Sequence, residues 1–386
     1  MRVGAMVRQL VEGCGANVHG KRLAALPKVV EGITRGGRLM PATIGRNLPG
    51  SAQPKHAIKC VDRLLGNVHL QRELLYLYCA IAHHLLHGCA RPVVLVDWTQ
   101  MAGTQVALVA AVPIGGRALP IYAEVRPLKK LSNAAVEERF LRSLAAILPA
   151  GSRPIVISDA GFKGPFFQAV LALGWDFLGR VRGTAKVLPT DGGPAISKEK
   201  LYARATIHPT ELGRFGLFVE QRIPCRLVLV RKRRKPGRKL PPPKCKEERE
   251  LRQAALDPWL LATSVSDGDA QYIVSLYAKR MQIEETFRDA KNHRFGWSLG
   301  DVRTDDVKRA AVLLLLAALA LVVVTLIGLT AEQRGVHRAY QANTVRRRVL
   351  SFFVLACTIL RRGDDPRMTL DTLRASLLFV SEAASA

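Results

Sequence analysis

Hydrophobic residues change their spacing along the chain near residue 92. In residues 1–91 they recur at helical intervals, interrupted by Pro and Gly, which predicts several helices with short connections. From residue 92 they occur in short runs typical of strands. "PVVLVD" predicts a strand that ends at Asp97, and the segments 106–114 and 118–125 predict two more strands. Strands this close in sequence pair as an antiparallel meander.

The next segment alternates helices with buried strands. Ser132 or Asn133 is expected to cap a helix that runs through Leu148. "PIVISDAGF" then predicts a buried strand that stops at Asp159, followed by a helix from Gly164 and a further strand, "DFLGRVR". The order is strand, strand, strand, helix, strand, helix, strand. One aspartate ends the first strand and another ends the fourth.

A strand-rich insert of roughly 70 residues is expected to follow. "GLFVEQR" and "RLVLVRKRRK" predict paired strands, and "PWLLATS" returns to strand character. Between Arg231 and Lys246 lie nine Lys or Arg residues in a Pro-rich segment. A mobile arm that follows DNA phosphates is the favoured interpretation, and a solvated loop without function is the alternative.

Two segments near the C-terminus have more than one interpretation. Residues 310–329 are apolar over a length that could span a membrane, but a helix that is hydrophobic all round is also typical of a buried core, which we favour. "VRRRVLSFFVLACTILRR", residues 345–362, is amphipathic and basic. A dimer contact, a DNA contact and simple closure of the domain are all open for it.

Charge then points to a polyanionic partner. The 386 residues include 58 Lys and Arg against 31 Asp and Glu, a net charge of +27, so nucleic acid is the expected partner. Basic residues accumulate in the N-terminal helices at Arg46, Lys55, His56, Lys59 and Arg63. A small helical DNA-binding domain is expected there, with an ordinary basic helical surface as the alternative.

The cysteines and histidines give no strong indication of a disulfide framework or a metal site. The seven cysteines are scattered without a CxxC pair, and no secretory signal is expected at the N-terminus, so a reducing cytoplasm fits best. His83, His87 and Cys89 lack a separated second pair of ligands, which makes the zinc signal weak.

The strongest chemical signal lies in "YAKRMQIEETFRDAKNHRFG", residues 277–296. On one continuous helix, Tyr277, Arg280, Glu284 and Lys291 would fall within a sector of about 60°. We call these four residues the charged row. A solvated helix with ion pairs is the alternative, but it leaves the two strand-end aspartates unexplained.

A pair of divalent ions would explain those aspartates. Asp97, Asp159 and Glu284 together could hold two Mg²⁺ ions, which activate a water or a 3′-hydroxyl and neutralise charge at a scissile phosphate. Arg280 and Lys291 would then hold the flanking phosphates, and Tyr277 would hydrogen-bond one.

These residues resemble a known family. "DWT" at 97–99, "SDAGFKGP" at 158–165 and the charged row are similar to bacterial insertion-sequence transposases of the DDE type, in the branch with the Y-(2)-R-(3)-E-(6)-K signature. The resemblance implies an α/β fold: a ribonuclease-H-like mixed sheet with flanking helices, a strand-rich insert, and helical N- and C-terminal regions. The implied domains are a helical DNA-binding region (1–91), a catalytic core in two parts (92–182 and 257–330), the insert with its basic loop (183–256) and a helical C-terminal region (331–386).

The resemblance also implies an activity, cut-and-paste DNA transposition. End nicking, hairpin formation and opening, and strand transfer would depend on two Mg²⁺ ions, which Mn²⁺ can replace, at Asp97, Asp159 and Glu284. The partners would be double-stranded DNA of the transposon ends and target, and a second copy of the chain in a homodimer on paired ends, without a membrane. The location would be the bacterial cytoplasm, at the nucleoid.

One further role follows from the resemblance. It implies a tryptophan of the insert that stacks on a flipped base, and Trp259 is the nearest candidate, although Trp98 and Trp297 compete and Trp259 could be a core residue. The alternative functions are a non-catalytic DNA-binding protein and a plain nuclease on the same fold.

Overall fold

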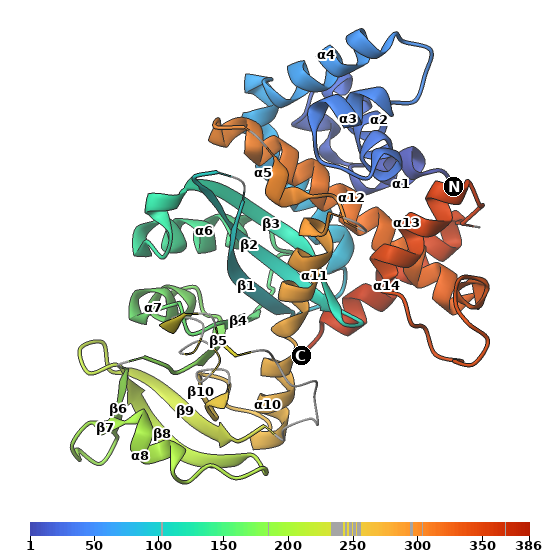
Figure 1. Cartoon of the computed structure of the whole chain (residues 1–386). Coiled ribbons are helices and arrows are strands. Elements are labelled where there is room, and N and C mark those ends of the chain that lie inside the picture. The colour runs from blue at the N-terminus through green and yellow to red at the C-terminus, as the bar shows by residue number, and fades with distance from the viewer. Residues whose placement is uncertain are drawn as a thin grey trace. The chain divides into compact units, whose positions relative to one another are not determined.

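The computed structural model describes residues 1–386 except 102, 184, 233–241, 244, 247, 248, 250, 251, 253–255, 294, 295, 303 and 367, and except the side chain of residue 301. The chain forms two compact units (Figure 1). Unit 1 contains Met1–Pro154 and Met281–Ala386, and unit 2 contains Ile155–Arg280.

The N-terminal part of unit 1 is helical, as the pattern of its hydrophobic residues predicts. Its elements are α1 (Val3–Leu10), η1 (Cys14–Ala16), α2 (Gly20–Gly36), α3 (Pro41–Arg46), α4 (Pro54–Leu65) and α5 (Val68–Leu85). Proline at the first position starts α3 and α4, where its missing N–H costs no hydrogen bond. The Asn67 side chain caps α5 by accepting bonds from the backbone N–H groups of His69 and Leu70.

A three-stranded antiparallel meander forms the sheet of unit 1, in the order β3-β2-β1. The strands are β1 (Val93–Gln100), β2 (Gln105–Ile114) and β3 (Arg117–Pro127), followed by η2 (Leu128–Lys130). Gly115 and Gly116 form the predicted turn, with φ angles of 49° and 90° that favour glycine. The predicted end of the first strand is wrong: β1 continues three residues past Asp97, which pairs with Val109, because β2 supplies partners up to Gln100.

Helix α6 (Ala134–Ile147) begins where the sequence predicts. Its N-cap is Asn133, whose side chain accepts a hydrogen bond from the backbone N–H of Val136. The side that faces the core carries Val136, Phe140, Leu141 and Leu144.

The centre of unit 1 is α12 (Val307–Gln333), which is buried from Ala310 to Ala331 apart from one residue. It is long and apolar enough to cross a membrane, yet 94% of its most apolar window is buried inside the protein. Helices α1, α2, α4 and α5, strand β3 and the two C-terminal helices all pack against it (Figure 1). The core interpretation of residues 310–329 is therefore confirmed.

The C-terminal part of unit 1 contains α11 (Met281–Lys291), η3 (Leu299–Asp301), η4 (Val336–Tyr340), α13 (Phe352–Arg362) and α14 (Leu370–Ala384). Helix α13 buries its apolar side against α12, so this part of residues 345–362 closes the core of unit 1. Gly328 of α12 makes the close approach possible, because a Cβ there would overlap the backbone of Phe352.

Unit 2 is a sheet with the order β4-β5-β10-β9-β8-β6-β7. Its elements are β4 (Ile155–Ser158), α7 (Gly164–Ala172), β5 (Asp176–Arg180), β6 (Lys186–Pro189), β7 (Ile196–Ser197), α8 (Lys198–Tyr202), β8 (Thr210–Leu217), β9 (Ile223–Val230), β10 (Trp259–Thr263) and α10 (Ala270–Ala278). Strands β4 and β5 are parallel, and the other pairs are antiparallel.

The insert departs from its prediction in one place. "GLFVEQR" was expected to be a strand, but β8 ends at Leu217 and the chain then turns through Phe218 and Arg222, whose φ angles are 61° and 47°. The hydrophobic pattern of residues 216–219 continues into the turn, which hides the end of the strand. Most of the predicted basic arm at 231–246 lies outside the described residues.

Candidate active site

The segment that carries the charged row is two helices rather than one. Tyr277 lies near the end of α10, Arg280 lies in the turn that follows, and Glu284 and Lys291 lie on α11. In the turn, Lys279 N–H donates to Leu276 O and Arg280 N–H donates to Tyr277 O, so the last turn tightens to three-residue bonds and the α-helix ends. The prediction of a single helical face for all four residues is therefore wrong.

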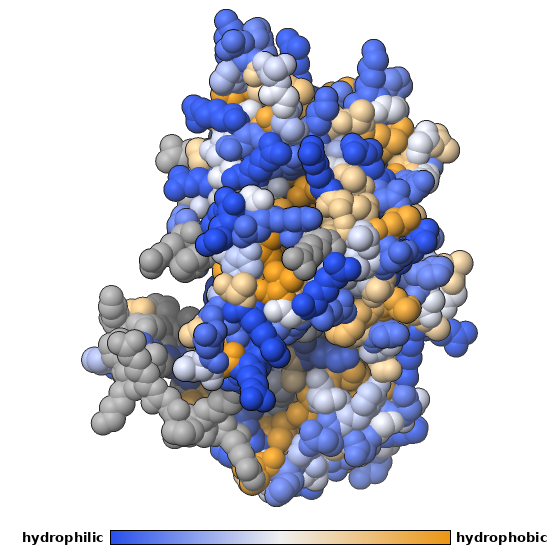
Figure 2. Space-filling view, turned by 90° about the vertical axis from the view of Figure 1, so that its right-hand side faces the viewer, coloured by the Kyte–Doolittle hydropathy of each residue, from blue (hydrophilic) through white to orange (hydrophobic). Residues whose placement is uncertain are grey.

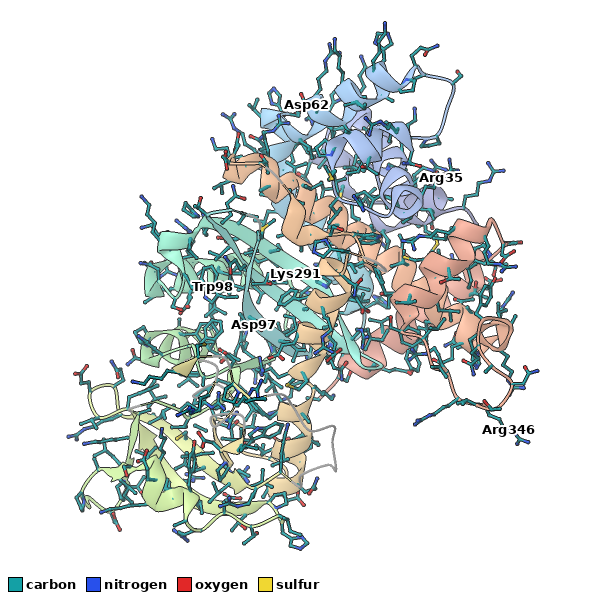
Figure 3. The ribbon with its side chains drawn as sticks, viewed as in Figure 1. Arg35, Asp62, Asp97, Trp98, Lys291 and Arg346 are labelled. Atoms are coloured by element: carbon teal, nitrogen blue, oxygen red, sulfur yellow. The ribbon has the colours of Figure 1, made fainter. Side chains whose placement is uncertain are left out.

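In unit 1, Lys291 lies beside Asp97. Asp97 and Thr99 are two residues apart on β1, so their side chains lie on the same face of the sheet. Lys291 Nζ donates a hydrogen bond of 2.8 Å to Thr99 Oγ1. Burial lowers the pKa of Lys291, while the Asp97 carboxylate acts in the opposite direction and raises it. The cation is thus held where it can neutralise charge next to Asp97 (Figure 3).

Glu284 lies on the same side of α11 as Lys291. The two are seven residues apart, about two helical turns, and both are half-buried. The fully buried face of the helix, with Ile283, Thr286 and Ala290, is adjacent. Glu284 is also in the first turn of α11, where a carboxylate is favoured by the helix dipole.

Helix α11 is fixed to the end of the β2–β3 hairpin. Thr286 Oγ1 accepts a 2.7 Å hydrogen bond from the N–H of Ala118 and lies 3.0 Å from the Ala118 carbonyl oxygen. Asp289 forms a 2.8 Å ion pair with Arg117 and accepts a 3.0 Å bond from the Ser351 hydroxyl. These contacts join residues more than 60 positions apart, so no local pattern in the sequence predicts them.

In unit 2, Asp159 follows directly after β4. Its Oδ1 accepts a 2.8 Å hydrogen bond from the N–H of Gly161, which leaves the half-buried carboxylate in a tight turn. Burial raises the pKa of Tyr277 from 10.0 to about 12, with Arg280 opposing the shift and Asp159 adding to it. Asp159, Tyr277 and Arg280 therefore belong to one electrostatic cluster.

Two arginines in this cluster were missed by sequence reasoning. Arg180 ends β5 and Arg182 follows two residues later, and both act on Tyr277 by lowering its pKa. Arg180 Nη2 donates to the carbonyl oxygens of Asp257 and Pro258 at 3.0 and 3.3 Å. Burial lowers the pKa of Arg180, and Arg182 lowers it further. Their spacing of two, at the end of an apolar strand, is the signal that could have revealed them.

Trp259 is a core residue as it lies here. It is 6% exposed, and its ring packs edge-on against Tyr277 at a centroid distance of 4.8 Å. Lys232 Nζ lies 3.6 Å from the centroid of the indole ring. Of its competitors, Trp98 is half-buried and Trp297 is fully buried.

A comparison with known protein families shows which family the chain belongs to. A family model described as "Transposase DDE domain" matches residues 89–321, more than half of the chain. The chain belongs to the transposase DDE domain family. The α/β architecture agrees with the ribonuclease-H-like fold of such transposases. No curated protein matches the chain.

Membership of this family establishes three general properties of the transposase. It is an enzyme of the nuclease and transposase type, its substrate is DNA, and domains of this family generally use divalent metal ions. The match covers the family as a whole, so the narrower branch with the Y-(2)-R-(3)-E-(6)-K signature stays a prediction.

The donor atoms of the three predicted metal ligands are of the type that Mg²⁺ binds. Asp97, Asp159 and Glu284 are half-buried carboxylates, the hard oxygen donors that Mg²⁺ prefers. Within the described part of the chain, no three His, Cys, Asp or Glu side chains are gathered closely enough to hold an ion. The donor types therefore fit Mg²⁺, and Asp97 and Glu284 lie in unit 1 whereas Asp159 lies in unit 2.

Proposed function

We propose that this chain catalyses cut-and-paste transposition of an insertion sequence: nicking at the element ends, hairpin formation, hairpin opening and strand transfer. The observation that supports this most is the pairing of each aspartate with part of the charged row. Lys291 lies beside Asp97, 194 positions away in sequence, and Tyr277 and Arg280 lie with Asp159. If the charged row only made a helix surface soluble, its side chains would not be expected to lie near both aspartates.

In this proposal Asp97, Asp159 and Glu284 hold two Mg²⁺ ions, with Mn²⁺ as a substitute. The ions supply a polarised nucleophile and stabilise charge at the scissile phosphate. Lys291 and Arg280 hold the phosphates on either side, and the phenol of Tyr277 would donate a hydrogen bond to one of them.

The base-stacking role of Trp259 is the least supported part. To stack on an extruded base, its ring would have to leave its edge-on contact with Tyr277. Trp259→Ala should then slow the hairpin step more than the first nick. A variant that loses both steps equally would identify Trp259 as a core residue only.

The central test is cleavage of an element-end duplex in Mg²⁺. Asp97→Ala, Asp159→Ala and Glu284→Ala should each abolish cleavage and leave DNA binding largely intact. Two matched controls are available. Asp191 accepts a bond from Gly193 N–H in a turn like that of Asp159, and Glu285 is a half-buried neighbour of Glu284 in an ion pair with Arg288.

The controls Asp191→Ala and Glu285→Ala should cleave like the wild type. Persistent cleavage by any of the three test variants would refute the assignment. Arg280→Ala and Lys291→Ala should weaken cleavage by misplacing the strand, more than they change its Mg²⁺ dependence. If both behave as wild type, the two cations of the charged row have no role in catalysis.

Helix α4 is the surface we propose for binding the element ends. Lys55, His56, Lys59 and Arg63 are exposed and lie within a sector of about 100°, opposite the buried side of the helix. The top of the face shown in Figure 2, at the height of α4 in Figure 1, carries mainly hydrophilic side chains. An exposed basic helix of this length fits the major groove of DNA.

Helix α4 is also firmly supported. Gly45 of α3 lets the two helices cross closely, because a Cβ there would overlap the backbone of Ile58. Asp62 forms an ion pair with Arg309 at the start of α12. A rigid support is what a helix needs to read a groove in one register.

The double variant Lys55→Ala/Lys59→Ala should bind end DNA more weakly and lower the slope of log K against log salt by about 2. Lys28→Ala, at an exposed lysine of the neighbouring helix α2, is the control and should change little. Equal effects of both changes would show that only overall charge matters.

The remaining alternatives make different products. A plain nuclease would cut the ends without joining their 3′-hydroxyls to a target plasmid, and a non-catalytic DNA-binding protein would do neither. The homodimer on paired ends is tested by light scattering with and without end DNA. We infer a cytoplasmic, nucleoid-associated location from the DNA substrate.

A further inference from the structure

A buried carboxylate lies next to the strand that carries Asp97. Glu137, on α6, is only 3% exposed, and its Oε1 accepts a 3.0 Å hydrogen bond from Trp98 Nε1. Trp98 stands between Asp97 and Thr99 on β1, so its side chain points to the opposite face of the sheet. Figure 3 shows Trp98 on the side of α6 and Lys291 on α11, on opposite sides of Asp97.

The position of Glu137 explains how a charge is tolerated there. Removing a carboxylate from water is costly unless it is hydrogen-bonded or neutralised. Glu137 lies at the N-terminal end of α6, just inside the helix that Asn133 caps, where the helix dipole favours a negative charge. Its bond to the indole N–H, at 3.0 Å, has the length of a well-formed N–H···O hydrogen bond and satisfies one of its oxygens.

Packing alone does not require this arrangement. Well-packed apolar side chains can replace buried ionic groups without loss of stability, so the burial of a carboxylate is weak evidence that it is there for stability. An indole has one N–H, and a strong acceptor for it fixes both the rotamer of Trp98 and the backbone from which it projects. That backbone is shared with Asp97.

Strand β1 is thus held on both faces around Asp97. On one face Lys291 donates to Thr99, and on the other face Trp98 donates to Glu137. We propose that Glu137 is a positioning residue, which acts through Trp98 to fix the Asp97 carboxylate for metal binding. This inference rests on the proposed role of Asp97 as a metal ligand.

Three variants separate the hydrogen bond from the packing. Glu137→Leu and Trp98→Phe each remove the bond, whereas Glu137→Gln keeps an acceptor oxygen of the same reach. The first two should raise the Mg²⁺ concentration for half-maximal cleavage about 10-fold, as changes to groups that orient a metal ligand do. Glu137→Gln should stay close to the wild type.

Glu138→Leu is the matched control. Glu138 is the next residue on α6, but it is exposed and pairs with Arg142, four residues on. It should leave the Mg²⁺ dependence unchanged, because its side chain is exposed and pairs with Arg142 on its own helix.

A second readout needs neither metal nor activity. In protein labelled with ¹⁵N-tryptophan, the indole N–H of Trp98 is identified by its loss in Trp98→Phe. It should exchange slowly with solvent in the wild type and in Glu137→Gln, and about 10-fold faster in Glu137→Leu if roughly 1.4 kcal/mol of protection is lost.

The outcomes are distinct. Unchanged Mg²⁺ dependence in both Glu137→Leu and Trp98→Phe overturns the proposal, and so does a Glu137→Gln variant as impaired as Glu137→Leu. If Glu137→Leu does not fold, Trp98→Phe and Glu137→Gln still decide. If Asp97→Ala cleaves normally, the proposed function fails instead, while the indole exchange still reports whether Glu137 holds Trp98.

Discussion

Replacing Thr286 with valine tests how α11 is held. Valine has nearly the shape of threonine but lacks the hydroxyl that accepts from Ala118 N–H at 2.7 Å. Both residues are buried, at 4% and 1% exposure, so no water replaces the lost partner. A buried donor left without an acceptor costs about 2 kcal/mol.

The loss should appear where α11 meets β3. Because the chain forms two compact units, a single global unfolding free energy is a poor measure, and hydrogen exchange of individual peptides is better. A loss of about 2 kcal/mol makes exchange about 30-fold faster. We expect this increase in peptides that contain Ala118 or α11, measured by mass spectrometry.

Two controls accompany the experiment. Thr286→Ser keeps the hydroxyl and should retain most of the protection. Thr358→Val, on α13, loses only a 2.8 Å bond to Val354 O within its own helix and should change little. If Thr286→Val exchanges like the wild type at Ala118, the hydroxyl does not hold α11 to β3.

Three further predictions follow from burial and close packing. Asp97→Asn should lower the pKa of Lys291 further, because burial already depresses it and the carboxylate is what raises it; an NMR titration of the lysine side chain measures this. The pKa of Tyr277 is raised from 10.0 to about 12, so its neutral form stabilises the fold below pH 10 and that stability is lost as the pH rises through 12. Between pH 10 and pH 12, the free energy of unfolding of Tyr277→Phe, measured by urea unfolding, should therefore fall less than that of the wild type. Gly328→Ala should destabilise the chain by about 1–3 kcal/mol through overlap with α13, whereas Gly20→Ala, with open space around it, should be neutral in thermal unfolding.

Local signals in the sequence were sufficient for much of the fold. Paired glycines at 115 and 116 placed the hairpin turn, Asn133 placed the start of α6, and an unbroken apolar run identified the core helix α12. In each case the residue type itself restricts the backbone or its burial. The strand that leads to Asp159 ends at Ser158, one residue before the predicted end, because polar and glycine residues follow its apolar run.

Other features depend on partners far away in sequence. Strand β1 continues past Asp97 because β2 lies opposite. Trp98 and Thr99 favour strands, but "DWTQ" ends the unbroken apolar run from which the strand was predicted. The helix break after Ala278 occurs without Pro or Gly in residues 277–284, so neither propensity nor periodicity reveals it. The contacts of Thr286 with Ala118 and of Glu137 with Trp98 are equally invisible in a pattern of hydrophobic positions.

The helix break changes the meaning of the charged row. As one helix, the row would present four side chains on one surface, and each would contribute through the same rigid element. The break after α10 assigns Tyr277 and Arg280 to unit 2 with Asp159, and Glu284 and Lys291 to unit 1 with Asp97. Each unit thus has its own aspartate and its own cation from the row, which keeps each carboxylate near a positive charge before any ion binds. The spacing of the four residues therefore has a reason other than a shared helical face: α10, a two-residue turn and α11 follow one another directly and place two of the four in each unit.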